Sequence, residues 1–201
     1  MQEVPAAEAL KLKGNLLELF SVGVLRKNLL ILLLVWSYTA FAYYLIPFYV
    51  GTIPSNMFLL MLCVAIAEIV GGLLCLCIVK RFNKKRALQM CCAVSCISSI
   101  GVMVFKFLYT GTSTLPMALL YLFLDVGVVV SFNLVFVIVV DLFPTLFLST
   151  AYGCGSFLGR VVTIAAPQIS RFDEPWPLCV LAVYAGIAAI FPLALTNVKS
   201  N

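Results

Sequence analysis

The sequence predicts an all-α, polytopic membrane protein with six transmembrane helices. Apolar residues make up 64% of the 201 residues and charged residues only 10%, whereas soluble domains average about 45–50% and 25%. The mean hydropathy is +1.15, and six apolar blocks each approach the ~20 residues that an α-helix needs to cross a bilayer. A water-soluble fold could not bury this much apolar surface, so lipid must surround most of it.

We expect the six spans at residues 28–50, 55–79, 87–109, 116–142, 147–170 and 176–195. The strands of a membrane β-barrel would alternate polar and apolar residues, but the run at 29–35 is continuously apolar, which favours helices. Turn-forming residues gather at 51–54, 111–114 and 173–175, between the spans that they connect. Connections this short make neighbouring helices antiparallel.

The lysines and arginines predict the orientation of the chain. Ten of the 13 precede the first span, lie between the second and third, or follow the sixth, and six crossings place all ten on one side of the membrane. The opposite side has Arg171 alone, while Lys106 and Arg160 lie inside spans. Because basic loops stay in the cytoplasm, we expect both termini there, with a segment at 1–27, a six-helix domain at 28–195 and a tail at 196–201.

The N-terminal segment does not have the pattern of a signal peptide. Residues 1–27 include three acidic and four basic residues, and no apolar run precedes the first span. Residues 16–25 could form a short amphipathic helix at the membrane surface.

Residues that usually support catalysis or metal binding are scarce. The chain has no histidine, the commonest metal ligand and proton shuttle, and the sequence has no convincing nucleophile–base pair. Nearly all of the eight cysteines fall within apolar spans, where cysteine usually packs as a small apolar residue. We therefore predict no enzyme activity, no cofactor, no metal site and no nucleic-acid partner, and contact with the lipid bilayer.

Four segments resemble motifs of one transporter family. Residues 80–86 (KRFNKKR) resemble the D-R-x-G-R-R loop of major facilitator transporters, and residues 141–145 (DLFPT) resemble the acidic-L-F/Y-P-T signature of organic cation/anion transporters. Residues 159–167 (GRVVTIAAP) and 36–44 (WSYTAFAYY) are similar to segments of that family's helices eleven and seven. The chain resembles the C-terminal six-helix half, helices 7–12, of the organic cation/anion transporter and synaptic vesicle two-related family in the major facilitator superfamily.

This resemblance implies a fold and a function. The fold would be two inverted three-helix repeats forming one half of a transporter, with the substrate between two halves. The first, second, fourth and fifth spans would face the cavity. The implied function is transport of small organic ions, organic anions preferred, by alternating access with a second six-helix half. That half could be another chain, a second copy of this chain, or a missing portion.

The cytoplasmic loops depart from the family pattern. Lys80 and Asn83 replace the Asp and Gly of the loop motif, and Leu148 stands where an Arg usually follows the P-T signature. In the family, charges of these loops pair across the two halves and gate the cavity. These departures favour an alternative function, a non-transporting structural subunit of a larger membrane complex derived from such a transporter. The gating charges that this chain retains would be Arg81, Lys84, Lys85 and Asp141.

Three charged residues inside the predicted spans are candidates for the substrate pathway. A charge at the bilayer centre costs about 2.5–3.5 kcal/mol, so it normally faces a cavity or a partner. Glu68 matches an acidic residue of some cation-transporting relatives, and either faces the cavity or is protonated or paired for packing alone. Arg160 falls where organic anion transporters place an Arg, and either binds an anionic ligand or pairs with Glu68 or Asp125. Asp125 and Asn133 share a stripe of the fourth span that we expect to line the aqueous path, unless Asp125 is solvated near the outer face.

The remaining candidates have simpler interpretations. Tyr43 and Tyr44 are expected to line the pocket, because the resemblance places their helix against the cavity, although aromatic residues also serve as packing or interface anchors. Lys106 lies near the outer end of the third span and is expected to extend its amine to the membrane interface. Small residues at helical spacing predict close helix packing at Gly71, Gly72, Gly155 and Gly159.

Overall fold

The computed structural model describes residues 16–51, 57–108 and 114–195. These residues form helices, and none of them is in a strand. The all-α class is therefore confirmed. In chain order the elements are α2 (Leu16–Ser21), α3 (Gly23–Val50), α4 (Met57–Arg81), α5 (Lys84–Leu108), α6 (Thr114–Leu142), α7 (Thr145–Thr163), α8 (Ala166–Ile169), α9 (Trp176–Ile190) and the 3₁₀ helix η1 (Phe191–Ala194).

Five helical segments of the described chain are long and apolar enough to cross a membrane. They are α3, α4, α5, α6 and the segment from α9 through η1, and they coincide with five of the six predicted spans. The expectation of a polytopic membrane protein is thereby confirmed. The count of six spans and the cytoplasmic termini stay predictions, because α7 is not among the five.

The predicted fifth span at 147–170 is interrupted. Helix α7 ends at Thr163 and α8 begins at Ala166, with Pro167 in the first turn of α8. Proline has no N–H to donate to the carbonyl four residues earlier, and its ring crowds that carbonyl. We therefore correct the expectation of one continuous helix over this range to two helical segments.

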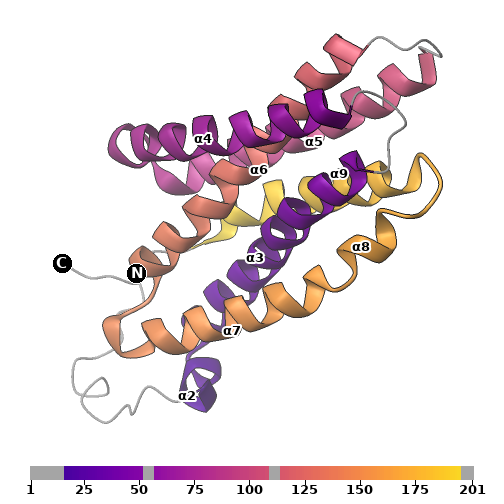
Figure 1. The fold of residues 1–201 in the computed structure, drawn as a ribbon. Coiled ribbons are helices and arrows are strands. Elements are labelled where there is room, and N and C mark those ends of the chain that lie inside the picture. The colour runs from indigo at the N-terminus through magenta and orange to yellow at the C-terminus, as the bar shows by residue number, and fades with distance from the viewer. Residues whose placement is uncertain (1–15, 52–56, 109–113, 196–201) are drawn as a thin grey trace.

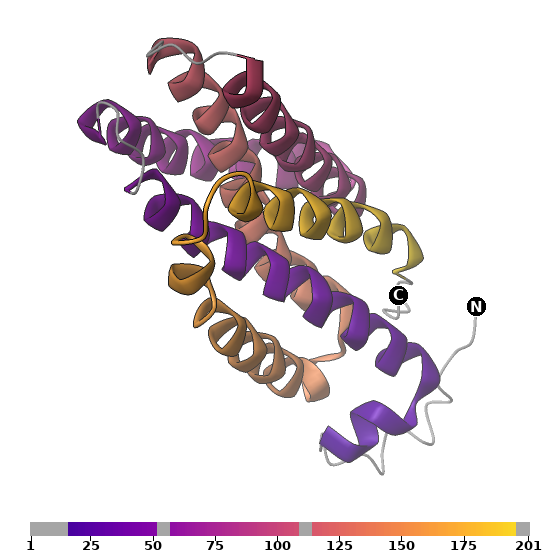
Figure 2. The same ribbon diagram turned by 90° about the vertical axis from the view of Figure 1, so that its right-hand side faces the viewer.

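The helices pack around two central elements. Helix α6 packs along α4 and α5, while α3 packs along α7 and α8. Contacts between α3 and α6 join these groups, and α9 packs against α5 and α3. Figure 1 shows α3 passing between the α4–α6 group and α7, and the turned view of Figure 2 shows α9 lying alongside α3.

The pattern of contacts has a partial internal symmetry, in which the α5–α6 contact is far more extensive than its counterpart between α9 and α3. If α3, α4 and α5 are matched with α6, α7 and α9, the pair α3–α7 corresponds to α6–α4, and the pair α5–α6 corresponds to α9–α3. The α3–α6 and α5–α9 pairs map onto themselves. Two three-helix repeats would produce this pattern, as the resemblance to a half-transporter implies.

Glycines allow the closest helix contacts. A Cβ added at Gly155 would lie 2.4 Å from Cε3 of Trp36, and one at Gly159 would lie 3.3 Å from Cβ of Ala40. On α4, a Cβ added at Gly71 would lie 2.8 Å from Cγ1 of Val129. The predicted packing role is thus confirmed for these three glycines. Beyond the neighbouring backbone of its own helix, no atom of the described residues lies within 4 Å of a Cβ added at Gly72, so the prediction was wrong for that residue in this bundle.

Candidate functional site

Aromatic side chains from α3, α6 and α7 form a continuous series. Tyr43 stacks on Phe132 with ring centroids 5.1 Å apart, and Phe132 contacts Phe136 edge-on at 5.0 Å. Phe136 contacts Trp36 at 4.9 Å and Tyr152 at 5.6 Å. We call this series the aromatic row, and its members are Trp36, Tyr43, Tyr44, Phe132, Phe136 and Tyr152.

Helical spacing explains why these rings meet. Trp36 and Tyr43 are seven residues apart on α3, and Phe132 and Phe136 are four apart on α6, so each pair occupies one face of its helix. Because α3 and α6 pack together, the two faces bring the rings into contact.

One side of the aromatic row is open. Tyr44 meets Tyr43 edge-on at 5.4 Å and is 49% exposed, while Tyr152 at the other end is 42% exposed. Tyr43 and Tyr44 were predicted from the sequence, whereas Phe136 and Tyr152 were not. The four-residue spacing from Phe132 was a signal for Phe136, but only the packing of α7 on α3 identifies Tyr152.

Glu68 is connected to the aromatic row through a hydroxyl. The Tyr43 Oη donates a hydrogen bond to Oε1 of Glu68 at 3.0 Å, and Glu68 is otherwise an exposed residue of α4. The pairing of Glu68 with Arg160, which we considered for the sequence, does not occur in the described part of the chain. Glu68 therefore presents a carboxylate beside the open side of the row.

Asp125 lies inside the bundle. It is 2% exposed, and its Oδ2 has no hydrogen-bond partner among the described residues. It lies four residues before Val129, which packs against Gly71 on α4, and Glu68 lies three residues before that glycine. Its burial argues against the alternative that Asp125 is solvated near the outer face.

The predicted stripe on α6 is only partly open. Val128 and Val129, next to Asp125 on this stripe, are buried, whereas Phe132 and Asn133 are half-buried. The Asn133 Nδ2 donates to the carbonyl of Val129 at 2.9 Å. This amide therefore has a hydrogen bond within its own helix.

Arg160 is an exposed residue in the last turn of α7. The ion pairs of the described chain do not include it. Its neighbour Gly159 packs against Ala40 and Trp36, so the backbone at this position is held against α3. The structure thus places an exposed guanidinium next to the α3–α7 contact that contains part of the aromatic row.

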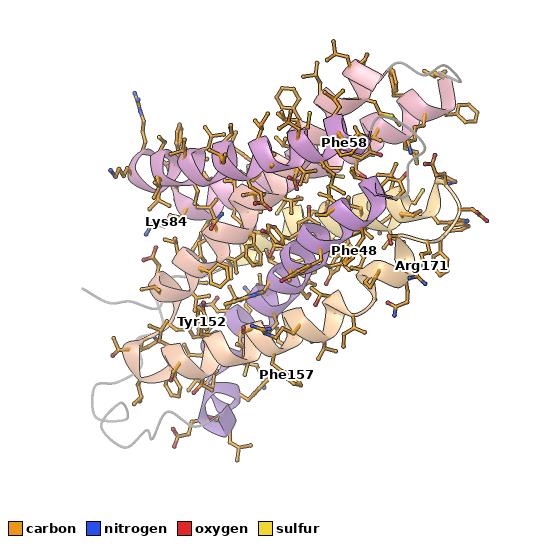
Figure 3. The ribbon with its side chains drawn as sticks, in the orientation of Figure 1. Phe48, Phe58, Lys84, Tyr152, Phe157 and Arg171 are labelled. Carbon is orange, nitrogen blue, oxygen red and sulfur yellow. The ribbon has the colours of Figure 1, made fainter. Side chains whose placement is uncertain are left out.

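The four predicted gating residues gather at one end of the bundle. Lys84 Nζ lies 2.6 Å from Oδ2 of Asp141, and Lys85 Nζ donates to the carbonyl of Leu195 at 2.9 Å. Arg81 is exposed at the end of α4. Figure 3 labels Lys84 at this end and Arg171 at the opposite end, as the charge pattern predicts. Two of the loop lysines therefore bind acceptors within this chain.

Lys106 makes contacts that the sequence did not reveal. Its ammonium forms an ion pair with Glu174, donates to the Tyr49 hydroxyl at 2.9 Å, and lies 4.9 Å from the centre of that ring. The Tyr49 Oη in turn donates to Glu174 Oε1 at 3.0 Å. The side chain is 13% exposed and that of Glu174 is 49% exposed, so the ammonium reaches the connection before α9, and its extension to the membrane interface stays a prediction. A pocket of about 510 Å³ adjoins this ion pair, with Met103, Phe107 and Leu178 in its wall.

The chain is similar to transporters of one solute carrier family. No protein-family model matches it. It is 26% identical to solute carrier family 22 member 6 of Oryctolagus cuniculus over 176 residues, which is 87% of this chain and 31% of that protein. The proteins of the same name from Mus musculus and Rattus norvegicus are 25% and 24% identical, over 87% and 89% of this chain.

The chain spans about a third of the length of these relatives, 31% to 32%. The similarity confirms the resemblance inferred from the motifs. Together with the five apolar helices, it identifies the chain as a multi-pass integral membrane protein.

Proposed function

We propose that this relative of the family 22 solute carriers forms one six-helix half of a transporter of small organic ions, with organic anions preferred. The observation that supports this most directly is the exposed guanidinium of Arg160, which has no ion pair among the described residues. A guanidinium stays charged at all physiological pH values. Within a membrane such a group normally faces water or a counter-charge, and an organic anion would supply that counter-charge.

The aromatic row supplies the apolar part of the proposed substrate-binding site. Carboxylate and sulfate groups accept two parallel hydrogen bonds from one guanidinium, and aromatic faces contact the apolar body of an organic ion. Tyr44 and Tyr152, both partly exposed, are the members best placed for such contact. We assign Arg160 to the charged group of the substrate, and Tyr43, Tyr44 and the rest of the row to its apolar part.

The proposed transporter needs a second wall. A six-helix unit provides one side of the cavity, and alternating access would arise when this unit rocks against a second six-helix half. Glu68, Asp125 and Asn133 would belong to this wall as further pathway residues. Arg81, Lys84, Lys85 and Asp141 would belong to its cytoplasmic gate.

Uptake into proteoliposomes tests the proposal. The tagged protein would be purified from its own cells with its associated chains, reconstituted, and supplied with radiolabelled benzoate or tetraethylammonium. We expect faster uptake of benzoate, and a loss of at least about tenfold in Arg160→Ala, since one charge-assisted contact contributes 1.5–3 kcal/mol. Arg160→Lys should retain part of the uptake, because it keeps the charge but not the planar fork.

Arg171→Ala is the matched control. It also removes one exposed arginine, but from the connection after α8 rather than from a helix that contributes to the aromatic row, so uptake should be unchanged. Absence of benzoate uptake by the wild type, or equal uptake by wild type and Arg160→Ala, would contradict the proposed function.

A structural subunit is the second candidate function. The ion pair of Lys84 with Asp141 and the hydrogen bond of Lys85 to Leu195 occupy two loop lysines inside this chain, which favours a fixed bundle over a mobile gate. The composition of the purified complex separates the two functions. A homologous first half in the complex supports transport, whereas several unrelated subunits support the structural role.

A further inference from the structure

Two acidic residues, Glu68 on α4 and Asp125 on α6, lie near the contact between these helices. The helices are in close contact at Gly71 and Val129, since a Cβ on the glycine would lie 2.8 Å from the valine Cγ1. Glu68 precedes Gly71 by three residues, and Asp125 precedes Val129 by four. The alternating direction of consecutive helices makes α4 and α6 parallel. Glu68 and Asp125, each about one turn before the Gly71–Val129 contact, therefore lie on the same side of that contact.

The two carboxylates have different surroundings. Asp125 is 2% exposed, and its Oδ2 has no hydrogen-bond partner in the described chain. Glu68 is exposed and accepts the Tyr43 hydroxyl proton at an Oη–Oε1 distance of 3.0 Å. The Glu68 carboxylate thus has a hydrogen-bond partner, whereas the Asp125 Oδ2 has none among the described residues.

Among the described residues, the ion pairs give neither carboxylate a cation. From α3, the Tyr43 hydroxyl contacts Glu68, and the Tyr44 ring contacts that of Tyr43. From α5, the Cys92 thiol donates to the Ser131 hydroxyl on α6 at 3.7 Å. From α7, Arg160 forms no ion pair with either carboxylate. Two negative charges side by side without a cation are strongly unfavourable in a low-dielectric interior.

We propose that Glu68 and Asp125 form a carboxylate pair that binds one exchangeable proton, carried on Asp125. The unpartnered, buried Oδ2 of Asp125 is the atom that would hold it, and release converts the carboxylic acid to a carboxylate plus a proton taken up by water. A metal ion fits these residues less well. Calcium takes six to eight oxygen ligands, and the described residues contain no group of three or more His, Cys, Asp or Glu that could hold a metal.

The proton would matter for transport. An organic anion that moves together with one proton carries no net charge across the membrane, so the membrane potential does not oppose it. This coupling rests on the proposed transport function, whereas the binding of the proton does not.

Labelling with dicyclohexylcarbodiimide tests proton binding without any substrate. The reagent combines with a protonated carboxyl group in apolar surroundings: the carboxyl oxygen adds to the carbodiimide carbon, the proton moves to nitrogen, and the acyl group then migrates to nitrogen. We expect the wild type in proteoliposomes to be labelled at Asp125, as mapped by mass spectrometry. Labelling should follow a single-proton titration curve and be lost at alkaline pH.

Substitutions test whether the pH dependence of labelling comes from Asp125 and Glu68. Asp125→Asn should abolish the label, and Glu68→Gln should shift the curve to lower pH, because the neighbouring negative charge is gone. Asp173→Asn, which removes an exposed loop carboxylate, is the matched control and should leave the curve unchanged. Since the wild-type curve requires no variant, a variant that fails to fold does not remove the test.

Three results would overturn the proton site: labelling of Asp125 that does not depend on pH, an identical curve in Glu68→Gln, or protection from labelling by sodium at constant pH. Benzoate uptake then tests the coupling, and an inward proton gradient should accelerate it in the wild type. Benzoate uptake without a pH-dependent labelling of Asp125 overturns the proton site. A normal labelling curve without benzoate uptake supports the proton site and contradicts the transport function.

Discussion

Tyr43 combines two contacts that substitution can separate. Its ring stacks on Phe132 and its hydroxyl donates to Glu68. The ring links α3 to α6, while the hydroxyl links α3 to α4. One residue thereby connects the aromatic row to the carboxylate pair.

Removing the hydroxyl should cost much less than removing the ring. We expect Tyr43→Phe to lower the free energy of unfolding by about 0.5–1.5 kcal/mol, the contribution of one hydrogen bond. Tyr43→Ala should lower it by about 2–4 kcal/mol, because it also leaves a cavity against Phe132. Unfolding in mild detergent measures both. Tyr44→Phe is the control and should match the wild type, because the Tyr44 hydroxyl has no hydrogen bond in the described part of the chain. Equal losses of stability in Tyr43→Phe and Tyr43→Ala would show that the stacking contributes nothing.

Lys106 illustrates a limit of residue-level interpretation. A lysine in the last turn of an apolar span usually extends to the interface, but its local sequence does not identify the partner that it meets there. Its partner Glu174 is 68 residues away, in the connection before α9. Burial of the Lys106 side chain follows from that pairing and from the Tyr49 ring beneath it.

At the scale of elements, glycines decide which helix faces meet. Helix α7 approaches α3 at Gly155, directly over the Trp36 ring. At the nearby Gly153, an added Cβ would have no atom of the described residues within 4 Å beyond the adjacent backbone of α7 itself. The same helix therefore carries a crowded and an open glycine two residues apart.

This pair provides a test of the helix contact. Gly155→Ala should destabilise the protein by about 1–3 kcal/mol, because the new methyl group forces α7 away from Trp36. Gly153→Ala should be neutral or stabilising by up to about 1 kcal/mol, because alanine favours helix over glycine. Thermal unfolding of the two variants measures the difference. Equal stability of the two would mean that α7 does not pack closely on α3.

Helix α7 also differs from the other long helices in composition. It is outside the set of apolar segments that could cross a membrane by themselves, and Arg160 lies in its last turn. Its contacts with α3, and the break before Pro167, are what distinguish it from an ordinary lipid-facing span. A helix with a charged residue and an open aromatic neighbour is suited to line a path rather than to face lipid.

At the scale of the whole molecule, the topology can be tested at two arginines. Arg81 ends α4 and Arg171 follows α8, and both are exposed. In a variant without the eight cysteines, Arg171→Cys should react with a membrane-impermeant maleimide on intact cells. Arg81→Cys should react only after permeabilisation, because basic loops remain cytoplasmic. Reaction of both variants from the same side would show that α7 does not cross the membrane and that the six-span prediction is wrong.

The class of the protein, the positions of five apolar helices, the family resemblance and the charged residues within the spans could all be predicted from the sequence. These properties depend on local composition, since a long apolar run crosses lipid wherever it stands in the chain. The packing of the helices was needed to show that Phe136 and Tyr152 join the aromatic row, that Lys106 meets Glu174, and that Asp125 is buried. Such contacts depend on how each helix is rotated and where it crosses its neighbours, and the close approaches at Gly71 and Gly155 set both.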